Sequence, residues 1–100
     1  MKVENITNNR GNKVPNQFIV EDCTIKHTTP NGTECFYTGI MFQSYNSNIA
    51  FKTNGSVLLD ERYWDYSVTT SKHRNIFLGE TTKETKAKIK SGEYKLTNLN

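Results

Sequence analysis

Residues 48–59 read NIAFKTNGSVLL, which is two short apolar runs separated by Asn54 and Gly55. An Asn-Gly pair between apolar runs is the strongest short-range signal of a β-hairpin, because both turn positions need a positive φ. The pattern therefore predicts strands over 48–53 and 56–59. This hairpin is the part of the fold that the sequence marks most clearly.

The chain before this hairpin predicts a second one. Residues 17–27 and 35–43 alternate between apolar and polar side chains, and turn-forming residues lie between them at 29–32. Residues 1–15 are polar, rich in Asn, and interrupted by glycine and proline. We expect these first residues to form an irregular N-terminal arm, with an edge segment of the sheet as the alternative.

Two short helices are predicted in the C-terminal part. The first covers about 70–78 and ends at Gly79, because glycine suits the left-handed position after a helix. The second follows Thr81, which stands three residues before Glu84 in the spacing of a capping box. Residues 94–99 alternate again and predict a last strand that returns to an edge of the sheet.

These elements predict a single α+β domain over residues 1–100, with a mainly antiparallel sheet of two hairpins, then two short helices and a C-terminal strand. The hydrophobic share is low, at 34%. Because so short a chain has little aliphatic material for its core, we expect a homo-oligomer whose interface completes that core.

The net charge of +3 comes from one part of the chain. Residues 61–100 hold eight Lys and Arg against five Asp and Glu, whereas the two signs cancel over residues 1–60. This excess favours an anionic partner. No apolar run is long enough to span a membrane, and the N-terminus lacks the apolar segment of a signal peptide, so we expect no membrane contact and a cytoplasmic location.

The two cysteines, Cys23 and Cys35, flank the turn of the second predicted hairpin. The expected register places Cys23 opposite Ile40 and Cys35 opposite Thr28, which keeps the sulfurs too far apart for a disulfide. We therefore expect free thiols. Two cysteines and two distant histidines do not make a zinc spacing, and we expect no metal and no cofactor.

Residues 64–78, WDYSVTTSKHRNIFL, combine aromatics, a run of hydroxyls and a short basic helix. The start of a helix can hold an anion, because unpaired backbone N–H groups point toward it. In this interpretation Thr70 and Ser71 donate hydrogen bonds, and Lys72 and Arg74 meet a phosphate group. The alternative is that a threonine merely caps a helix whose apolar end fills the core.

Residues 42–48, FQSYNSN, join two aromatics to small polar and amide side chains. This composition is typical of a recognition surface, in which Gln43 would read a ligand and Tyr45 would stack on it. Tyr66 is the other candidate for stacking. The structural alternative is a strand end that bends into a loop, where Asn and Ser bond their own backbone.

The sequence gives little support for an enzyme. Phosphate-loop, dinucleotide-binding, zinc-protease and nucleophile-elbow motifs are all absent from it. His73 has no carboxylate at helical spacing to orient its ring. Aromatic, amide and cationic side chains together predict instead a binding module for a nucleotide, for a single-stranded nucleic acid, or for a protein surface.

Four segments resemble a family of small proteins of unassigned function that tailed phages and prophages encode. They are NQFIV at 16–20, FQSYNS with IA at 42–50, WDYS-x-TTSK to FL at 64–78, and KIKSGEY-x-L-x-NL at 88–99. The likeness covers most of the chain after residue 16, but not residues 21–39. It implies a phage origin and the cytoplasm of the host, and it brings no catalytic assignment.

We therefore expect a phage-encoded, non-enzymatic counter-defence protein that binds and sequesters a phosphate-bearing, cyclic or linear nucleotide signal of host immunity. The alternative is an inhibitor that binds a host defence protein, such as a CRISPR nuclease. A small nucleic-acid-binding phage regulator is a further alternative, for which the charge excess is small.

Overall fold

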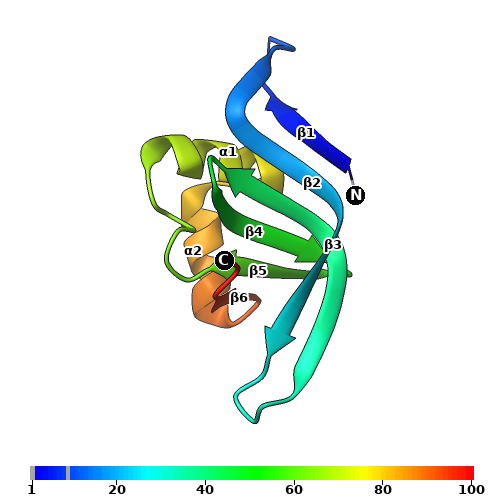
Figure 1. The fold of residues 1–100 in the computed structure, drawn as a ribbon. Coiled ribbons are helices and arrows are strands. Elements are labelled where there is room, and N and C mark those ends of the chain that lie inside the picture. Colours follow the sequence, from blue (N-terminus) through cyan, green and yellow to red (C-terminus); the bar gives the residue numbers. More distant parts are fainter. Residues whose placement is uncertain (1, 9) are drawn as a thin grey trace.

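The computed structural model describes residues 2–8 and 10–100. Six strands form one sheet in the order β1-β2-β3-β4-β5-β6, with two helices between the last two strands (Figure 1). The elements are β1 Lys2–Thr7, β2 Lys13–Thr28, β3 Glu34–Ser44, β4 Ser47–Thr53, β5 Ser56–Asp60, α1 Val68–Leu78, α2 Thr82–Ser91 and β6 Tyr94–Thr97. The predicted α+β class is confirmed.

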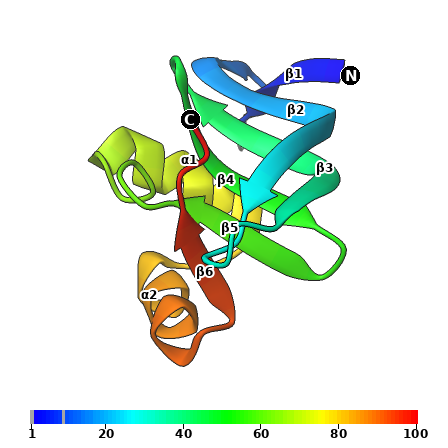
Figure 2. The same cartoon turned by 60° about the horizontal axis from the view of Figure 1, so that its bottom comes forward.

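The first four strand pairs are antiparallel, and β5 and β6 are parallel. Antiparallel neighbours can be joined by short turns, whereas parallel neighbours need a long crossover. The two helices supply that crossover, which carries the chain from the end of β5 back to the start of β6. Both helices lie on one side of the sheet (Figure 2).

The local signals in the sequence are confirmed. Asn54 and Gly55 join β4 to β5 with φ angles of 27° and 79°. Thr81 and Glu84 form the capping box that starts α2, and each side chain accepts a hydrogen bond from the other residue's backbone N–H. Gly79 ends α1 in the left-handed conformation.

Of the two predictions for residues 1–15, the edge segment is confirmed, and the irregular arm is wrong for most of the described residues. Residues 2–7 form the edge strand β1, and β2 already begins at Lys13. A polar segment can be a strand here because an outer strand has few buried positions, and Ile6 fills one of them at 2% exposure. Pro15 lies where the pairing of β1 with β2 is irregular, so its missing N–H is tolerated. Met1 and Asn9 lie outside the described residues.

The register of the β2–β3 hairpin differs by one residue from the predicted one. Cys35 lies opposite His27, and Cys23 lies opposite Gly39. The turn is one residue longer than an Asn-Gly turn would be, because the backbone N–H of Thr29 donates to the carbonyl of Thr33. The expectation of free thiols is nevertheless confirmed.

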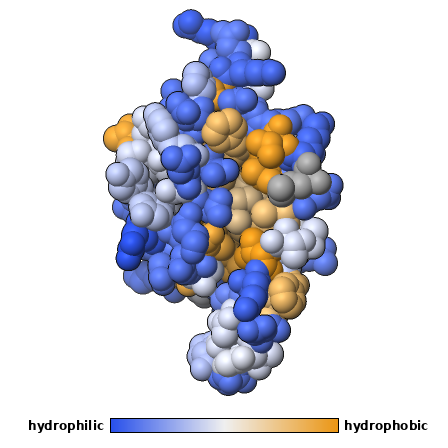
Figure 3. All heavy atoms as spheres, in the orientation of Figure 1, coloured by the Kyte–Doolittle hydropathy of each residue, from blue (hydrophilic) through white to orange (hydrophobic). Residues whose placement is uncertain are grey.

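Apolar side chains pack on both faces of the sheet. On the helix side, Phe42 stacks on Phe77 of α1 with ring centroids 5.7 Å apart, and Leu59 belongs to the same cluster. On the other side, Met41 and Phe51 pack with neighbours that include Leu99 from the C-terminal tail. This second face carries a band of partly exposed apolar side chains (Figure 3). None of the described helices is both long enough and apolar enough to cross a membrane.

Candidate functional site

The basic helix begins earlier than predicted. Ser67 is the N-cap of α1, and its hydroxyl accepts a hydrogen bond from the backbone N–H of Thr70. Thr70 therefore lies one turn inside the helix. Its side chain is buried at 3% exposure, and its hydroxyl is 3.1 Å from that of Ser44 on β3. The hydroxyl of Thr70 thus links the helix to the sheet, while Ser67 occupies the helix start that was assigned to Thr70 and Ser71.

Arg74 is completely buried at 0% exposure, which contradicts its predicted role as a phosphate ligand. Its guanidinium donates to the backbone carbonyl of Trp64 and lies 3.3 Å from the Asp65 carboxylate. The second terminal nitrogen donates to Asn75 and to Thr82, each at 2.9 Å. A buried cation is stable when it is paired and hydrogen-bonded in this way. Arg74 therefore holds α1, the preceding loop and the start of α2 together.

The carboxylate of Asp65 occupies the place where an anionic ligand was expected. The Ser71 hydroxyl donates to it at 2.6 Å, and Arg74 reaches the same oxygen. The hydrogen bond from Ser71, followed by that from Arg74, outweighs the effect of burial and lowers the pKa of Asp65. The protein thus neutralises these donors with a charge of its own.

Lys72 is exposed and does not join Arg74 in a clamp. It lines an open hollow of about 730 Å³, which we call the Lys72 hollow, together with Asp65 and Ser71. The sequence-predicted residues Ser71 and Lys72 are therefore neighbours at one surface, but the acid beside them reduces its attraction for an anion.

Three tyrosines surround a second hollow, which has a volume of about 430 Å³ and which we call the tyrosine hollow. Tyr45 and Tyr66 are 58% and 69% exposed, and Tyr63 meets Tyr66 edge to face with centroids 5.5 Å apart. The other lining residues are Ser44, Asn46, Ser47, Ile49, Ser67 and Thr70. None of these described lining residues is charged.

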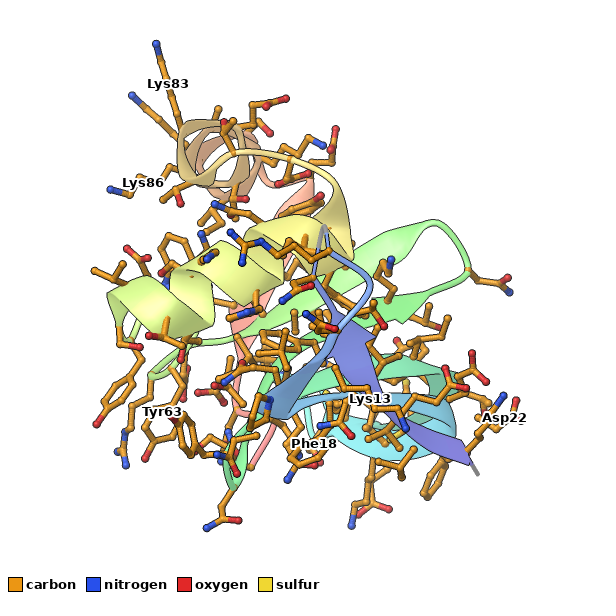
Figure 4. The ribbon with its side chains drawn as sticks, turned by 90° about the horizontal axis from the view of Figure 1, so that it is seen from above. Lys13, Phe18, Asp22, Tyr63, Lys83 and Lys86 are labelled. Atoms are coloured by element: carbon orange, nitrogen blue, oxygen red, sulfur yellow. The ribbon has the colours of Figure 1, made fainter. Side chains whose placement is uncertain are left out.

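The backbone around the tyrosine hollow is held on both sides. Tyr45 stands in the two-residue turn between β3 and β4 with φ 54°, and its N–H donates to the carbonyl of Asn16 at 2.7 Å. On the other side, the buried carboxylate of Asp60 accepts from the backbone N–H of Tyr63 at 2.8 Å. Figure 4 shows Tyr63 beside the first turns of α1. Hydrogen bonds therefore hold the backbone of Tyr45 and Tyr63 in place on the two sides of the hollow.

The structure brings together three of the predicted site residues, Tyr45, Tyr66 and Thr70, at the tyrosine hollow. Gln43 does not join them. It is half-buried on β3, pairs with Phe18 and Asn48 on the neighbouring strands, and lies outside the lining of this hollow. Its predicted role in reading a ligand at this surface is not supported.

Sequence reasoning missed Tyr63 and a cleft beside the long β2–β3 hairpin. The cleft has a volume of about 520 Å³ and includes His27, Phe36 and Tyr37 among its lining. It arises because β3 runs past the end of β4, so the two strands separate beyond Gly39. The available signal was the pair of adjacent aromatics, Phe36 and Tyr37, near a hairpin turn. Over residues 2–8 and 10–100, no group of three or more His, Cys, Asp and Glu is placed to hold a metal ion.

The helix α2 carries lysines of two kinds. Lys83 and Lys86 are exposed and point away from the body of the protein (Figure 4). Lys88 instead donates to the Glu80 carboxylate at 2.8 Å, and the hydroxyl of Tyr94 donates to the same oxygen at 2.6 Å. Lys88, Glu80 and Tyr94 thus join α2 to β6, so Lys88 stabilises the fold and is not available for a ligand in the way that the exposed lysines are.

Comparison with protein-family models gives one match. The model of a family of unknown function, DUF8033, matches residues 1–93, so the chain belongs to this family. A search of curated proteins and a search of solved structures each found no match.

Proposed function

We propose that this member of DUF8033 is a non-enzymatic inhibitor that binds a partner protein through the tyrosine hollow. The observation that carries the proposal is the grouping of Tyr45, Tyr63 and Tyr66 around one uncharged hollow. Tyrosine combines a large, stiff apolar ring with a polar hydroxyl, and tyrosines accordingly supply much of the binding energy of protein interfaces.

The residues between the tyrosines support a protein partner. Ser47, Asn46 and Ser67 bring small hydroxyl and amide groups to the same lining. Tyrosine with serine and asparagine is the composition by which antibody loops bind protein surfaces, because the rings supply area and the small groups adapt their hydrogen bonds. The held backbone at Tyr45 reduces the entropy that the surface loses on binding.

Sequestration of a nucleotide signal is less well supported by the same geometry. A nucleotide phosphate requires cations or free backbone donors, and the described lining of the tyrosine hollow offers no charged group. The Lys72 hollow offers one lysine, with the Asp65 carboxylate beside it. Arg74 is engaged within the protein.

The resemblance to phage proteins supplies the setting for the proposal. A phage protein that binds without catalysis can protect the phage by blocking a host defence effector, and a CRISPR nuclease is the class to test first. Lysine side chains on α2 and the +3 net charge would assist approach to an acidic partner surface.

The experiment titrates the purified protein into DNA-cleavage reactions of purified CRISPR nucleases and measures direct binding by biolayer interferometry. We expect inhibition of at least one nuclease, and a Kd that rises at least about tenfold in Tyr66→Ala and Tyr45→Ala. Tyr37→Ala is the matched control, because Tyr37 lines the separate hairpin cleft.

Two results would count against the proposal. One is binding that survives both tyrosine substitutions unchanged, which would place the interface elsewhere. The other is tight binding of cyclic or linear nucleotides in calorimetry, together with no effect on any nuclease tested, which would favour sequestration.

A further inference from the structure

We infer that β1 is a self-association edge, through which two copies of this chain pair antiparallel and extend their sheets into one. The inference does not depend on the proposed function. β1 is the outermost strand in the order β1-β2-β3-β4-β5-β6 and borders open space on its outer side (Figure 1). An outer strand presents backbone N–H and C=O groups that another strand can bind.

The charges on β1 favour a second copy of this chain as the strand that pairs with its outer edge. Lys2 and Glu4 lie on the same face of the strand and form an ion pair at 2.8 Å, with Val3 between them on the opposite face. When two β1 strands run antiparallel about a two-fold axis at Val3, Lys2 of each copy stands opposite Glu4 of the other. Opposite charges placed directly across a strand pair stabilise it.

The same charges exclude the neighbouring registers. The smallest slip that keeps each side chain on its own face of the sheet is two residues. A slip of two residues places either Lys2 opposite Lys2 or Glu4 opposite Glu4, and like charges directly opposite destabilise a strand pair. The Lys-Val-Glu sequence is therefore complementary to itself in one register.

The apolar side of β1 favours the same arrangement. Val3 is 57% exposed and lies opposite Val20 of β2, on the face of the sheet that turns away from the helices. In the paired state the two Val3 side chains would meet at the axis and join the exposed apolar bands of the two copies (Figure 3). Burial of this apolar area adds to the strand pairing.

The predicted association is weak, because in this register only Lys2, Val3 and Glu4 of the described part of β1 face one another across the axis, and such a contact is smaller than a standard interface. It is tested by sedimentation equilibrium of the purified protein at low ionic strength. We expect the wild type to dimerise with a Kd at or below about 1 mM, and Glu4→Lys and Lys2→Glu each to remain monomeric. Each variant alone places like charges opposite each other.

The decisive sample is an equimolar mixture of the two variants. It is expected to dimerise again, because the two β1 lysines of the Glu4→Lys variant then face the two β1 glutamates of the Lys2→Glu variant. Lys26→Glu is the control, since it breaks an exposed ion pair with Glu34 at 3.0 Å on the distant hairpin and is expected to leave the dimer intact. The side chains of Lys2 and Glu4 are 64% and 52% exposed, so both variants are expected to fold.

Three results would overturn the inference. The first is a wild type that stays monomeric at about 1 mM. The second is a Glu4→Lys variant that dimerises as the wild type does, which would assign the dimer to another surface. The third is a mixture of the two variants that stays monomeric while circular dichroism shows both to be folded.

Discussion

The guanidinium of Arg74 and the carboxylate of Asp65 lie 3.3 Å apart, with the Arg74 side chain completely buried and that of Asp65 about one-third exposed. The pair closes the site at which the sequence predicts binding of an anion. It also leaves Lys72, two residues before Arg74, as the exposed cation of this part of the helix. The polar groups of this segment therefore bind mainly to one another and not to a ligand.

Replacement of Arg74 by Met is expected to destabilise the protein by about 1–3 kcal/mol, because it leaves the partly buried acceptors around the guanidinium without their donor. Urea unfolding measures this loss. Lys72→Met is the control, and its effect is expected to stay within about 0.5 kcal/mol, as for other exposed positions. Equal effects of the two substitutions would contradict the structural role of Arg74.

The carboxylate of Asp60 is expected to hold both the C-terminal tail and one side of the tyrosine hollow. It is buried and accepts hydrogen bonds from the backbone N–H groups of Leu99, Arg62 and Tyr63. Asp60→Ala leaves these donors unpaired and should cost at least about 2 kcal/mol in urea unfolding. The neighbouring exposed Glu61→Ala should have little effect, and a similar loss in both would argue against the role of Asp60.

Stability is expected to fall in acid partly through Glu80. Burial raises the pKa of this carboxyl, but hydrogen bonds from Lys88, Thr85 and Tyr94 outweigh that effect, and the pKa in the folded protein is lowered. A lowered pKa stabilises the folded state above the pKa of the unfolded chain, and this contribution is lost as the pH falls through the folded value. Urea unfolding measured across the range below about pH 5 should therefore show a shallower decline for Glu80→Gln. An identical pH dependence in wild type and variant would contradict the assignment.

Gly39 is expected to be required where β3 separates from β4. A Cβ atom at this position would lie 2.0 Å from the backbone carbonyl oxygen of Lys52. Backbone must move to admit it, and such overpacking costs about 1–3 kcal/mol or more. Urea unfolding of Gly39→Ala measures the loss, with Thr28→Ala at an exposed position of β2 as the control. An unchanged urea midpoint for Gly39→Ala would contradict this prediction, because it would show that the backbone of Lys52 moves away from the new Cβ atom at no cost in stability.

The parts of the fold that were predicted correctly depend on signals contained within a few residues. The turn at Asn54 and Gly55 is defined by the backbone angles of those two residues, and the capping box at Thr81 by hydrogen bonds within four residues. Strand β1 was predicted only as the alternative to an irregular arm, because an outer strand needs few apolar side chains. The bulge that shifts the β2–β3 pairing near Asp22, where φ is 52°, has no comparable local signal.

The candidate site was harder to predict, because it depends on which way a short helix faces. Thr70, His73, Arg74 and Phe77 form the buried side of α1, and their spacing is that of one helical face. This spacing was the available evidence that Arg74 is turned inward while Lys72 is exposed. The tyrosine hollow joins the β3–β4 turn to a loop about twenty residues later, which local patterns do not reveal.

The central claim is that the tyrosine hollow is the surface that binds a partner protein. Hydrogen–deuterium exchange of this chain, alone and in complex with a nuclease that it inhibits, tests the claim most directly. The account predicts slower exchange on binding over residues 44–49 and 63–70, the two segments that line the hollow. Slower exchange confined to residues 34–39 of the hairpin, with no change in those two segments, would contradict it.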